Sequence, residues 1–308
     1  MLHPTQELEP PANPARFKFL DPGTIHHRFP EGLHDLLPGG TWNLLVGQLT
    51  DDGEMALALA RSIVTSRGYD PEATGAAYMA WGNSRPFDMG TTTRQGLASI
   101  AGRGRANFSS QANGALMRAA PIGIAAKGVP NRAGAWARLD ASLTHPHPVT
   151  QAANAAFCAA IAVGVAGGDR QAMYDAAWEW GALGQDEDAS AVRECLYDST
   201  SAGPSDFMTR QGWVLIALQN AFHHPMSHRP LAEAVSQTVM QGGDTDTNAA
   251  ICGALIGAVE GRGALPVAWQ SQILGCRAVA LPHVAHPRPS AYWADDALEL
   301  AEALITQG

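Results

Sequence analysis

Apolar residues recur at helical spacing along most of the chain, and loops rich in Gly, Pro and His separate these segments. The pattern predicts helices over residues 51–64, 72–83, 92–100, 112–124, 132–142, 148–166, 171–183, 207–222 and 231–240, with a further helix after residue 247. The segment lengths show no repeating period of the kind that indicates a solenoid. The chain is therefore predicted to fold as a multi-helix domain.

Two of these helices differ from the rest. The helix that begins at Asp51 is hydrophobic nearly all round, which predicts a central position. The helix after Thr247 carries Gly253, Gly257 and Gly261 at every fourth position, so one face lacks side chains and a neighbouring backbone can approach closely. We expect these two helices to be packing partners.

Composition sets the fold class. Residues 1–40 are rich in Pro and Gly and predict an irregular N-terminal arm with one short helix near residues 22–29. The 308 residues are 46% hydrophobic and contain no long linker, so residues 41–308 are predicted to form one compact domain. Abundant alanine and only 7% aromatic residues favour helix over sheet. The predicted fold is all-α.

Net charge and the lack of long apolar runs indicate which classes of partner the chain is not expected to bind. The formal net charge is -9 and no run of basic residues is present, so a nucleic-acid partner is not expected. The N-terminus has no apolar core of a signal peptide, and the apolar run 249–259 is shorter than the roughly 20 residues that span a bilayer. No membrane partner is expected, and cytoplasm is the predicted location. The scattered cysteines, predicted to be reduced, are Cys158, Cys195, Cys252 and Cys276.

Two acidic segments stand where helices begin, and they carry the strongest chemical signal. Residues 241–248 read QGGDTDTN, and residues 47–55 read GQLTDDGEM. Both place carboxylates and a hydroxyl just before an apolar helical run. Asp and Thr oxygens are hard ligands, so together the segments predict a Mg²⁺ or Mn²⁺ site.

Helix capping is the ordinary alternative for each segment. Asp51 as N-cap with Glu54 three residues later would form a capping box, which explains the first segment about as well as a metal does. In the second segment only one residue can cap, so metal binding is the better explanation there. An EF-hand loop starting at Asp244 would need Gly and Glu where the chain has Ala249 and Leu255, which excludes that alternative.

Two loops offer further candidates. Asn113-Gly114 predicts a turn that feeds a helix N-terminus, a geometry suited to phosphate, although such turns are common in any loop. Asp88 lies on a Pro/Gly loop, where it could meet a cationic leaving group or simply be solvated.

Two aromatic candidates also remain open. His145 is predicted to contact a substrate hydroxyl, while for His147 a turn fixed by two prolines is an equal alternative. Trp213 could stack on a base, although a tryptophan on an amphipathic helix is more often a core residue.

Taken together, these residues resemble the ADP-ribosylglycohydrolases, and most of all the bacterial dinitrogenase reductase activating glycohydrolases. The similarity covers residues 19–269, and its motifs are GQLTDDGEM at 47–55, NGALMR at 113–118, LTH at 143–145 and QGGDTDT at 241–247. The resemblance implies a compact all-α domain with a binuclear Mg²⁺ or Mn²⁺ centre in a cleft that binds ADP-ribose. The ligands it implies are Thr50, Asp51, Asp52, Asp244, Asp246 and Thr247.

The same resemblance assigns the remaining roles. It implies that Asn113 and Gly114 line the diphosphate and ribose region, that His145 contacts ribose, and that Trp213 packs near adenine. The catalytic residues it implies are Asp52, Asp88 and Asp246. The expected reaction is hydrolysis of the glycosidic bond between ADP-ribose and a modified side chain, with ADP-ribosylarginine as the expected substrate. The expected partner is an ADP-ribosylated protein or an ADP-ribose-containing small molecule.

The start of the chain departs from the family pattern. A glycine-rich helix with a Gly-Asp-Ala-Leu-Gly signature, followed by a metal-proximal glutamate, is missing, and Lys18 aligns with that glutamate. A cation beside two metal ions is repelled unless it points away. Two hypotheses follow: Glu7 or Glu9 replaces the missing acid, or the chain is a non-catalytic ADP-ribose-binding or structural member of the family.

Overall fold

The computed structural model describes residues 17–181 and 187–307, and every regular element in these ranges is a helix, as the sequence predicts. The α-helices, in chain order, are α1 (Pro22–Arg28), α2 (Asp51–Ser66), α3 (Pro71–Asn83), α4 (Thr91–Ile100), α5 (Ala120–Ala125), α6 (Pro130–Thr144), α7 (Pro148–Val165), α8 (Arg170–Gly181), α9 (Glu187–Ser199), α10 (Val214–Met226), α11 (Leu231–Met240), α12 (Thr245–Glu260), α13 (Val267–Gly275) and α14 (Ala297–Gln307). Three 3₁₀ helices join them: η2 (Asn113–Arg118), η3 (Arg262–Ala264) and η4 (Ser290–Tyr292).

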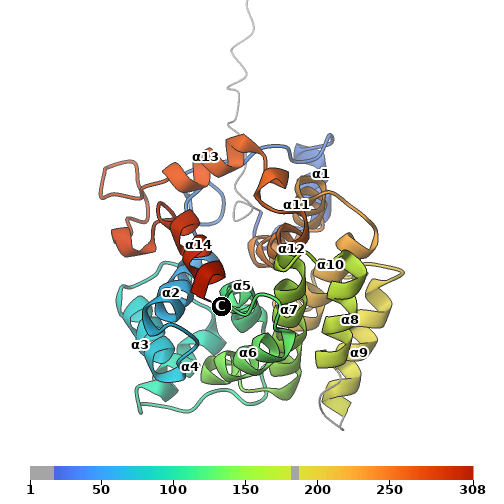
Figure 1. Cartoon of the computed structure of the whole chain (residues 1–308). Coiled ribbons are helices and arrows are strands. Elements are labelled where there is room, and N and C mark those ends of the chain that lie inside the picture. Colours follow the sequence, from blue (N-terminus) through green and yellow to red (C-terminus); the bar gives the residue numbers. More distant parts are fainter. Residues whose placement is uncertain (1–16, 182–186, 308) are drawn as a thin grey trace, which may run out of the picture.

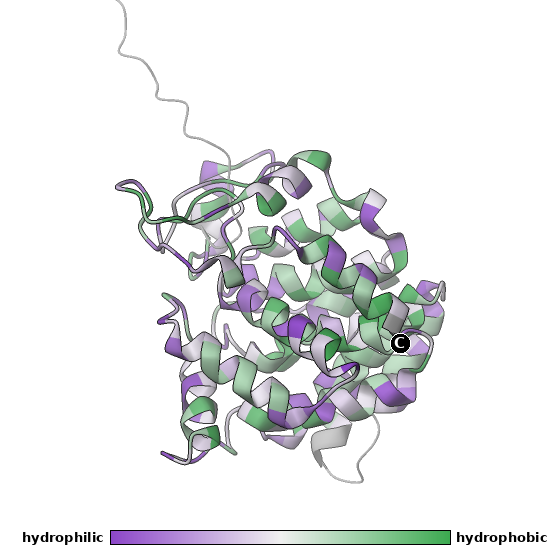
Figure 2. Cartoon of the chain, turned by 60° about the vertical axis from the view of Figure 1, so that its left-hand side comes forward, coloured by the Kyte–Doolittle hydropathy of each residue, from purple (hydrophilic) through white to green (hydrophobic). Residues whose placement is uncertain are grey.

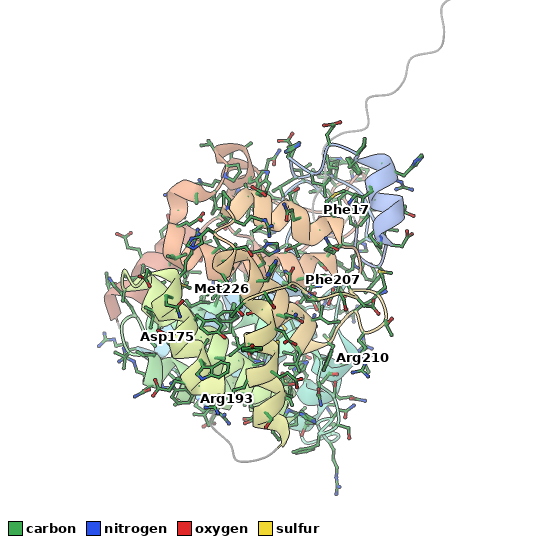
Figure 3. All side chains as sticks on the ribbon, turned by 90° about the vertical axis from the view of Figure 1, so that its right-hand side faces the viewer. Phe17, Asp175, Arg193, Phe207, Arg210 and Met226 are labelled. Carbon is green, nitrogen blue, oxygen red and sulfur yellow. The ribbon has the colours of Figure 1, made fainter. Side chains whose placement is uncertain are left out.

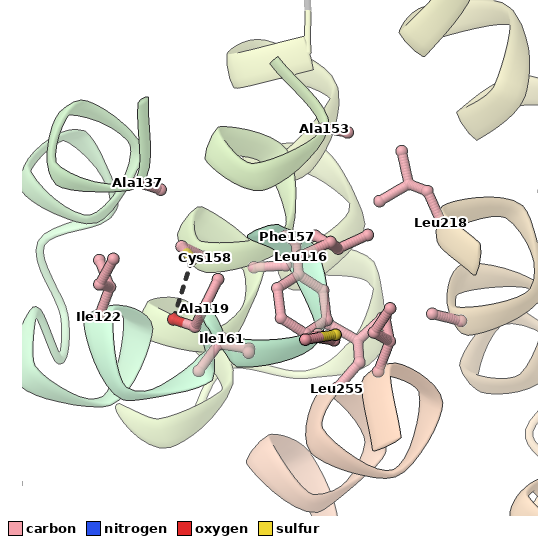
Figure 4. Packing of buried hydrophobic residues seen from close by; sticks show 14 of the residues in the cluster. Leu116, Ala119, Ile122, Ala137, Ala153, Phe157, Cys158, Ile161, Leu218 and Leu255 are labelled. Atoms are coloured by element: carbon pink, nitrogen blue, oxygen red, sulfur yellow. Dashed lines mark hydrogen bonds between the residues drawn. The ribbon is translucent and has the colours of Figure 1, made fainter. Parts of the chain in front are cut away.

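Helix α7 is the centre of the domain. It packs against α6 and α8, and also against α5 and α12; Figure 1 shows it between α2–α4 on one side and α8–α10 on the other. Small alanine side chains line much of α7 and let its neighbours approach closely, while Phe157 and Ile161 fill the remaining space (Figure 4). In Figure 2 hydrophobic and hydrophilic residues alternate along most helices, as expected of helices that each turn one side to the interior.

Helix α7 is also the one described helix that is long and apolar enough to cross a membrane. Its 18 residues have a mean hydropathy of 1.4, and 78% of them are buried inside the domain. The sequence predicts this helix over 148–166, although only the run 249–259 was compared with the length of a membrane span. Because its apolar surface is covered by other helices, burial in the core explains its composition.

Several helix boundaries differ from the predictions. The predicted helix over 112–124 is two elements, η2 and α5, and Pro121 lies in the first turn of α5, where a missing N–H is tolerated. The predicted helix over 207–222 begins only at Val214. Helices α9, α13 and α14 were not predicted, and residues 182–183 of the predicted helix over 171–183 lie outside the described residues.

The glycine face of α12 packs against α11 rather than α2. A Cβ atom at Gly253 would lie 3.4 Å from Val235, and one at Gly257 would lie 3.7 Å from Leu231. Gly261 ends the helix with a positive φ of 74°. Helices α2 and α12 do contact each other, but the expectation that the glycines serve this contact is wrong.

The segment after α13 is fastened to α2 by a buried ion pair. Arg288 donates to both carboxylate oxygens of Glu54, at 2.7 and 2.8 Å, and Trp81 donates to the same carboxylate at 2.8 Å. Burial raises the pKa of Glu54, and the hydrogen bonds from Arg288 and Trp81 oppose this shift. Glu54 is therefore a structural anchor for α2.

Replacing Arg288 with leucine should leave Glu54 buried without its countercharge. We expect the variant Arg288→Leu to lower the free energy of unfolding by about 3–5 kcal/mol, measured by urea denaturation at pH 7. The double variant Arg288→Leu with Glu54→Leu should recover part of this loss, because no unpaired charge remains. A single variant as stable as the unmodified protein would contradict the assignment.

Candidate functional site

The two acidic helix entrances meet in the interior. Asp52 in the first turn of α2 and Asp246 in the first turn of α12 are 4% and 6% exposed, and both line one cavity of about 470 Å³. The far side of this cavity is apolar and includes Trp269 of α13 and small residues of α12. Segments far apart in the chain thus place their carboxylates side by side, next to a space of ligand size.

Helix capping does not account for these carboxylates. The N-cap of α2 is Thr50, not Asp51, and Glu54 is bound to Arg288, so the proposed capping box is absent. Asp244 is the N-cap of α12, yet its side chain makes no capping hydrogen bond. The hydroxyl of Thr50 instead donates to Oδ2 of Asp52 at 2.7 Å. These carboxylates are therefore not needed to cap the two helices.

Lys18 points directly into this acidic cluster. Its ammonium donates to Oδ2 of Asp88 at 3.0 Å and to Oδ2 of Asp246 at 3.2 Å, and its Nζ lies 3.5 Å from Oδ1 of Asp244. Burial alone would lower the pKa of Lys18, but the surrounding carboxylates, led by Asp246 and Asp244, raise it above its ordinary value. Lys18 is thus a buried, protonated cation.

The glycine pair before α12 positions Lys18. Gly242 and Gly243 have φ angles of 74° and 71°, and a Cβ on either would collide with a backbone carbonyl oxygen, that of Leu20 or of Phe207. The segment containing Lys18 lies against this bend: Phe19 N–H donates to Gly243 at 2.7 Å, and Gly243 N–H donates to Leu20 at 3.0 Å. This glycine turn therefore fixes the backbone that carries the lysine.

Some carboxylate oxygens in the cluster remain without hydrogen-bond partners. Oδ1 of Asp51, Oδ1 of Asp52 and Oδ1 of Asp246 are buried and accept no hydrogen bond. Burial raises the pKa of Asp51 and of Asp246 well above the ordinary value, and neighbouring carboxylates add to this effect while Lys18 opposes it. Hard, buried, unpartnered oxygens are the donors that suit a divalent cation.

The predicted pair of metal ions does not fit the cluster as it stands. Lys18 already binds three of the carboxylates. Within residues 17–181 and 187–307, no three His, Cys, Asp or Glu side chains are gathered in a way that could hold a metal ion. The free carboxylate oxygens are of the hard type that a divalent cation prefers, but side chains would have to shift before an ion could bind.

Asn113 joins the acidic cluster from η2. Its side-chain amide donates to Oδ2 of Asp244 at 2.8 Å, and its backbone N–H donates to Gly212 at 2.9 Å. The neighbouring Trp213 donates from its indole to Gln111 at 2.7 Å and lines a separate hollow of about 240 Å³. Trp213 is thus near the Asn113 turn but outside the cavity that holds Asp52. Figure 3 labels Phe17, Phe207 and Arg210 along this side of the molecule.

His145 is buried beneath the Asn113-Gly114 turn. It is 1% exposed, and a Cβ at Gly114 would lie only 2.9 Å from its Nε2, so glycine is needed there. Burial, assisted by the Arg118 guanidinium, lowers the pKa of His145 to about 3, so the ring is neutral near pH 7. His147 has a structural role, because its Nδ1 accepts from Val149 N–H at the start of α7.

Some of the buried polar residues around the site were not predicted from the sequence. Arg118 donates to Asp140 at 3.2 Å and to Thr144 at 2.9 Å beneath the Asn113 turn. Asn248 is fully buried, and neither end of its amide has a partner. The sequence feature that could have identified Asn248 is its position directly after residues 244–247, which read DTDT. Glu7 and Glu9, the suggested replacements for an acid, lie outside the described residues.

Comparisons with known proteins agree with this architecture. A family model described as ADP-ribosylglycohydrolase matches residues 12–307. The chain is 30% identical over 264 residues to the ADP-ribosyl-[dinitrogen reductase] glycohydrolase of Rhodospirillum rubrum, covering 84% of each chain. It is 24% identical to the ADP-ribosylarginine hydrolase Tri1 of Pseudomonas putida, covering 79% of this chain and 67% of that one. A solved structure titled ADP-ribosylglycohydrolase-related protein complex is similar with a TM-score of 0.76 and 26% identity, covering 96% of this chain and 93% of that chain.

The role of the glycine pair can be tested by two matched substitutions. Gly243→Ala should be strained by its positive φ, by about 1–2 kcal/mol, and also by the collision with Phe207. Gly102→Ala has a similar φ of 65° and no neighbouring atom within 4 Å, so it should show the conformational strain alone. Urea denaturation should therefore give a larger loss for Gly243→Ala, whereas equal losses would show that the contact with Phe207 imposes no constraint.

Proposed function

The chain belongs to the ADP-ribosylglycohydrolase family and is an enzyme that cleaves glycosidic bonds, and we propose that it releases ADP-ribose from arginine side chains. The observation that carries this proposal is the buried cluster of Asp51, Asp52, Asp88, Asp244 and Asp246 beside a cavity. The names of the relatives support the substrate, because they include ADP-ribosylarginine hydrolases and a hydrolase of ADP-ribosyl-dinitrogen reductase.

The charge of the cluster suits the reaction. Cleavage at the anomeric carbon of ribose passes through an oxocarbenium-like state that carries positive charge, and the departing arginine is itself a guanidinium cation. Carboxylates held in a buried site stabilise such charge more strongly than they would in water. In this proposal Asp52 and Asp246 orient the attacking water at the cavity wall, and Asp88 faces the leaving guanidinium.

The remaining residues are proposed to hold the nucleotide. Asn113 is fixed to Asp244 by its side-chain amide, so its turn lies directly beside the carboxylates. We assign Asn113 and Gly114 to the diphosphate and ribose, with His145 supporting the ribose position from beneath Gly114. Trp213 is assigned to the adenine. The supporting geometry is the pairing of the Asn113 turn with the backbone around Trp213.

We further propose that the activity requires Mg²⁺ or Mn²⁺. The residues that would hold the cation are Thr50, Asp51, Asp52, Asp246 and Thr247. When bound, such an ion supplies positive charge that lowers the pKa of a coordinated water. The buried oxygens without partners on Asp51, Asp52 and Asp246 support this proposal.

We propose a cytoplasmic location because the cysteines form no disulfide bonds. The four cysteines are free, and three of them are buried. Free cysteines are usual in a reducing compartment.

The substrate proposal predicts a selective and metal-dependent assay. The protein should release ADP-ribose from ADP-ribosylarginine in Mg²⁺ or Mn²⁺ but not in excess chelator, and more slowly from serine-linked or nucleotide-linked ADP-ribose. Asp246→Asn should lower the rate by about 10²–10³-fold, the range typical for removing one electrostatic group from an active site. Asp175→Asn, an exposed change of the same kind on α8, should leave the rate unchanged.

Two results would contradict this proposal. One is binding of ADP-ribose without release from any of the three linkages by folded, metal-supplied protein. The other is unchanged activity in Asp246→Asn. Release from the serine linkage alone would keep the family chemistry but overturn the choice of arginine.

A further inference from the structure

We propose that Lys18 is a built-in cation of the acidic site, that it takes the place of one divalent ion, and that the protein therefore binds a single divalent ion. This inference deepens the proposed function, because it concerns the cation requirement of the same site. Beside two metal ions, Lys18 was expected to point away from the site. Its ammonium instead points into the carboxylates.

Three carboxylates surround the ammonium of Lys18, as carboxylates surround a bound metal ion. Nζ lies within 3.0 to 3.5 Å of oxygens from Asp88, Asp244 and Asp246, and its side chain is only 7% exposed. A lysine ammonium is a compact point charge, whereas an arginine guanidinium is a flat fork that prefers a single carboxylate. Lysine is the basic side chain that can be surrounded by three acids in this way.

The backbone on both sides of Lys18 is anchored. Phe17 is fully buried, and its ring meets that of Phe29 edge to face at 5.3 Å. Thr41 donates to the carbonyl oxygen of Lys18 at 3.0 Å, and Phe19 N–H is bound to Gly243. The ammonium is therefore held in the cluster from both ends, and it cannot be removed by a shift of a free loop.

One position for a divalent ion remains after Lys18 is in place. The buried oxygens that accept no hydrogen bond are Oδ1 of Asp51, Asp52, Asp244 and Asp246, and of these the Asp244 oxygen lies 3.5 Å from the Lys18 ammonium. Oδ2 of Asp88, Asp244 and Asp246 each accept from a side-chain donor. Asp51 and Asp52 of α2 thus keep oxygens that Lys18 does not contact, while Lys18 lies toward Asp88 and Asp244.

The charge balance supports this division. Five carboxylates, one ammonium and one divalent ion carry a net charge of minus two. An acid in place of Lys18 together with two divalent ions would carry the same net charge. A lysine and one ion are therefore electrostatically equivalent to an acid and two ions, and both leave negative charge for a cationic leaving group.

The sequence supplies a matched control for the test. Lys18 and Lys127 are the only lysines in the chain, and Lys127 lies exposed after α5. Lys18→Glu and Lys127→Glu change the net charge by the same amount, but only the first changes the acidic cluster. Lys18→Met removes the ammonium without adding an acid, so it serves if Lys18→Glu does not fold.

The experiment is a Mn²⁺ titration of the full chain after its metal has been removed by chelation and dialysis. Calorimetry gives the number of bound ions, and electron paramagnetic resonance separates an isolated Mn²⁺ from a coupled pair. We expect one equivalent with an isolated signal for the unmodified protein and for Lys127→Glu. We expect a second equivalent in Lys18→Glu, with a coupled signal, and a weaker second equivalent in Lys18→Met.

Several outcomes would overturn the inference. They are two equivalents in the unmodified protein, no binding in it, or a single equivalent in both Lys18 variants. Failure of the proposed function can be distinguished from these outcomes. If the unmodified protein binds one ion and Lys18→Glu binds two, but no ADP-ribose is released from arginine, the inference stands and the substrate assignment is wrong.

Discussion

The ammonium of Lys18 and the carboxylates of Asp88, Asp244 and Asp246 share one buried position, where an unpaired charge would cost several kcal/mol. This contact links three distant parts of the chain: the segment before α1, the loop after α3 and the start of α12. It also determines which acids are free for other chemistry. The arrangement of the candidate site follows from where this one positive charge lies.

Two further buried ion pairs brace the helices around this cluster. Arg288 and Glu54 tie the C-terminal segment to α2, while Arg118 and Asp140 tie η2 to α6. Buried pairs of this kind add little net stability, but losing one partner is costly. They therefore hold the Asp52 helix and the Asn113 turn in fixed positions, and a site that stabilises developing charge requires such preorganisation.

Much of the fold was predictable from helical periodicity, whereas the centre of the site was not. The prediction of α2 and α11 succeeded because their apolar residues recur at clear helical spacing. Helix α13 was missed because only Trp269 on it is buried, so it carries almost no pattern. The inward position of Lys18 depends on Gly242 and Gly243, whose bend no periodicity encodes.

The central claim is that one metal ion and one lysine share the cluster, and an anomalous difference map from crystals grown with Mn²⁺ tests it most directly. The account predicts a single anomalous peak beside Asp51, Asp52 and Asp246, with the Lys18 ammonium still in contact with Asp88. Two peaks within the cluster, with Lys18 turned out of it, would contradict the account.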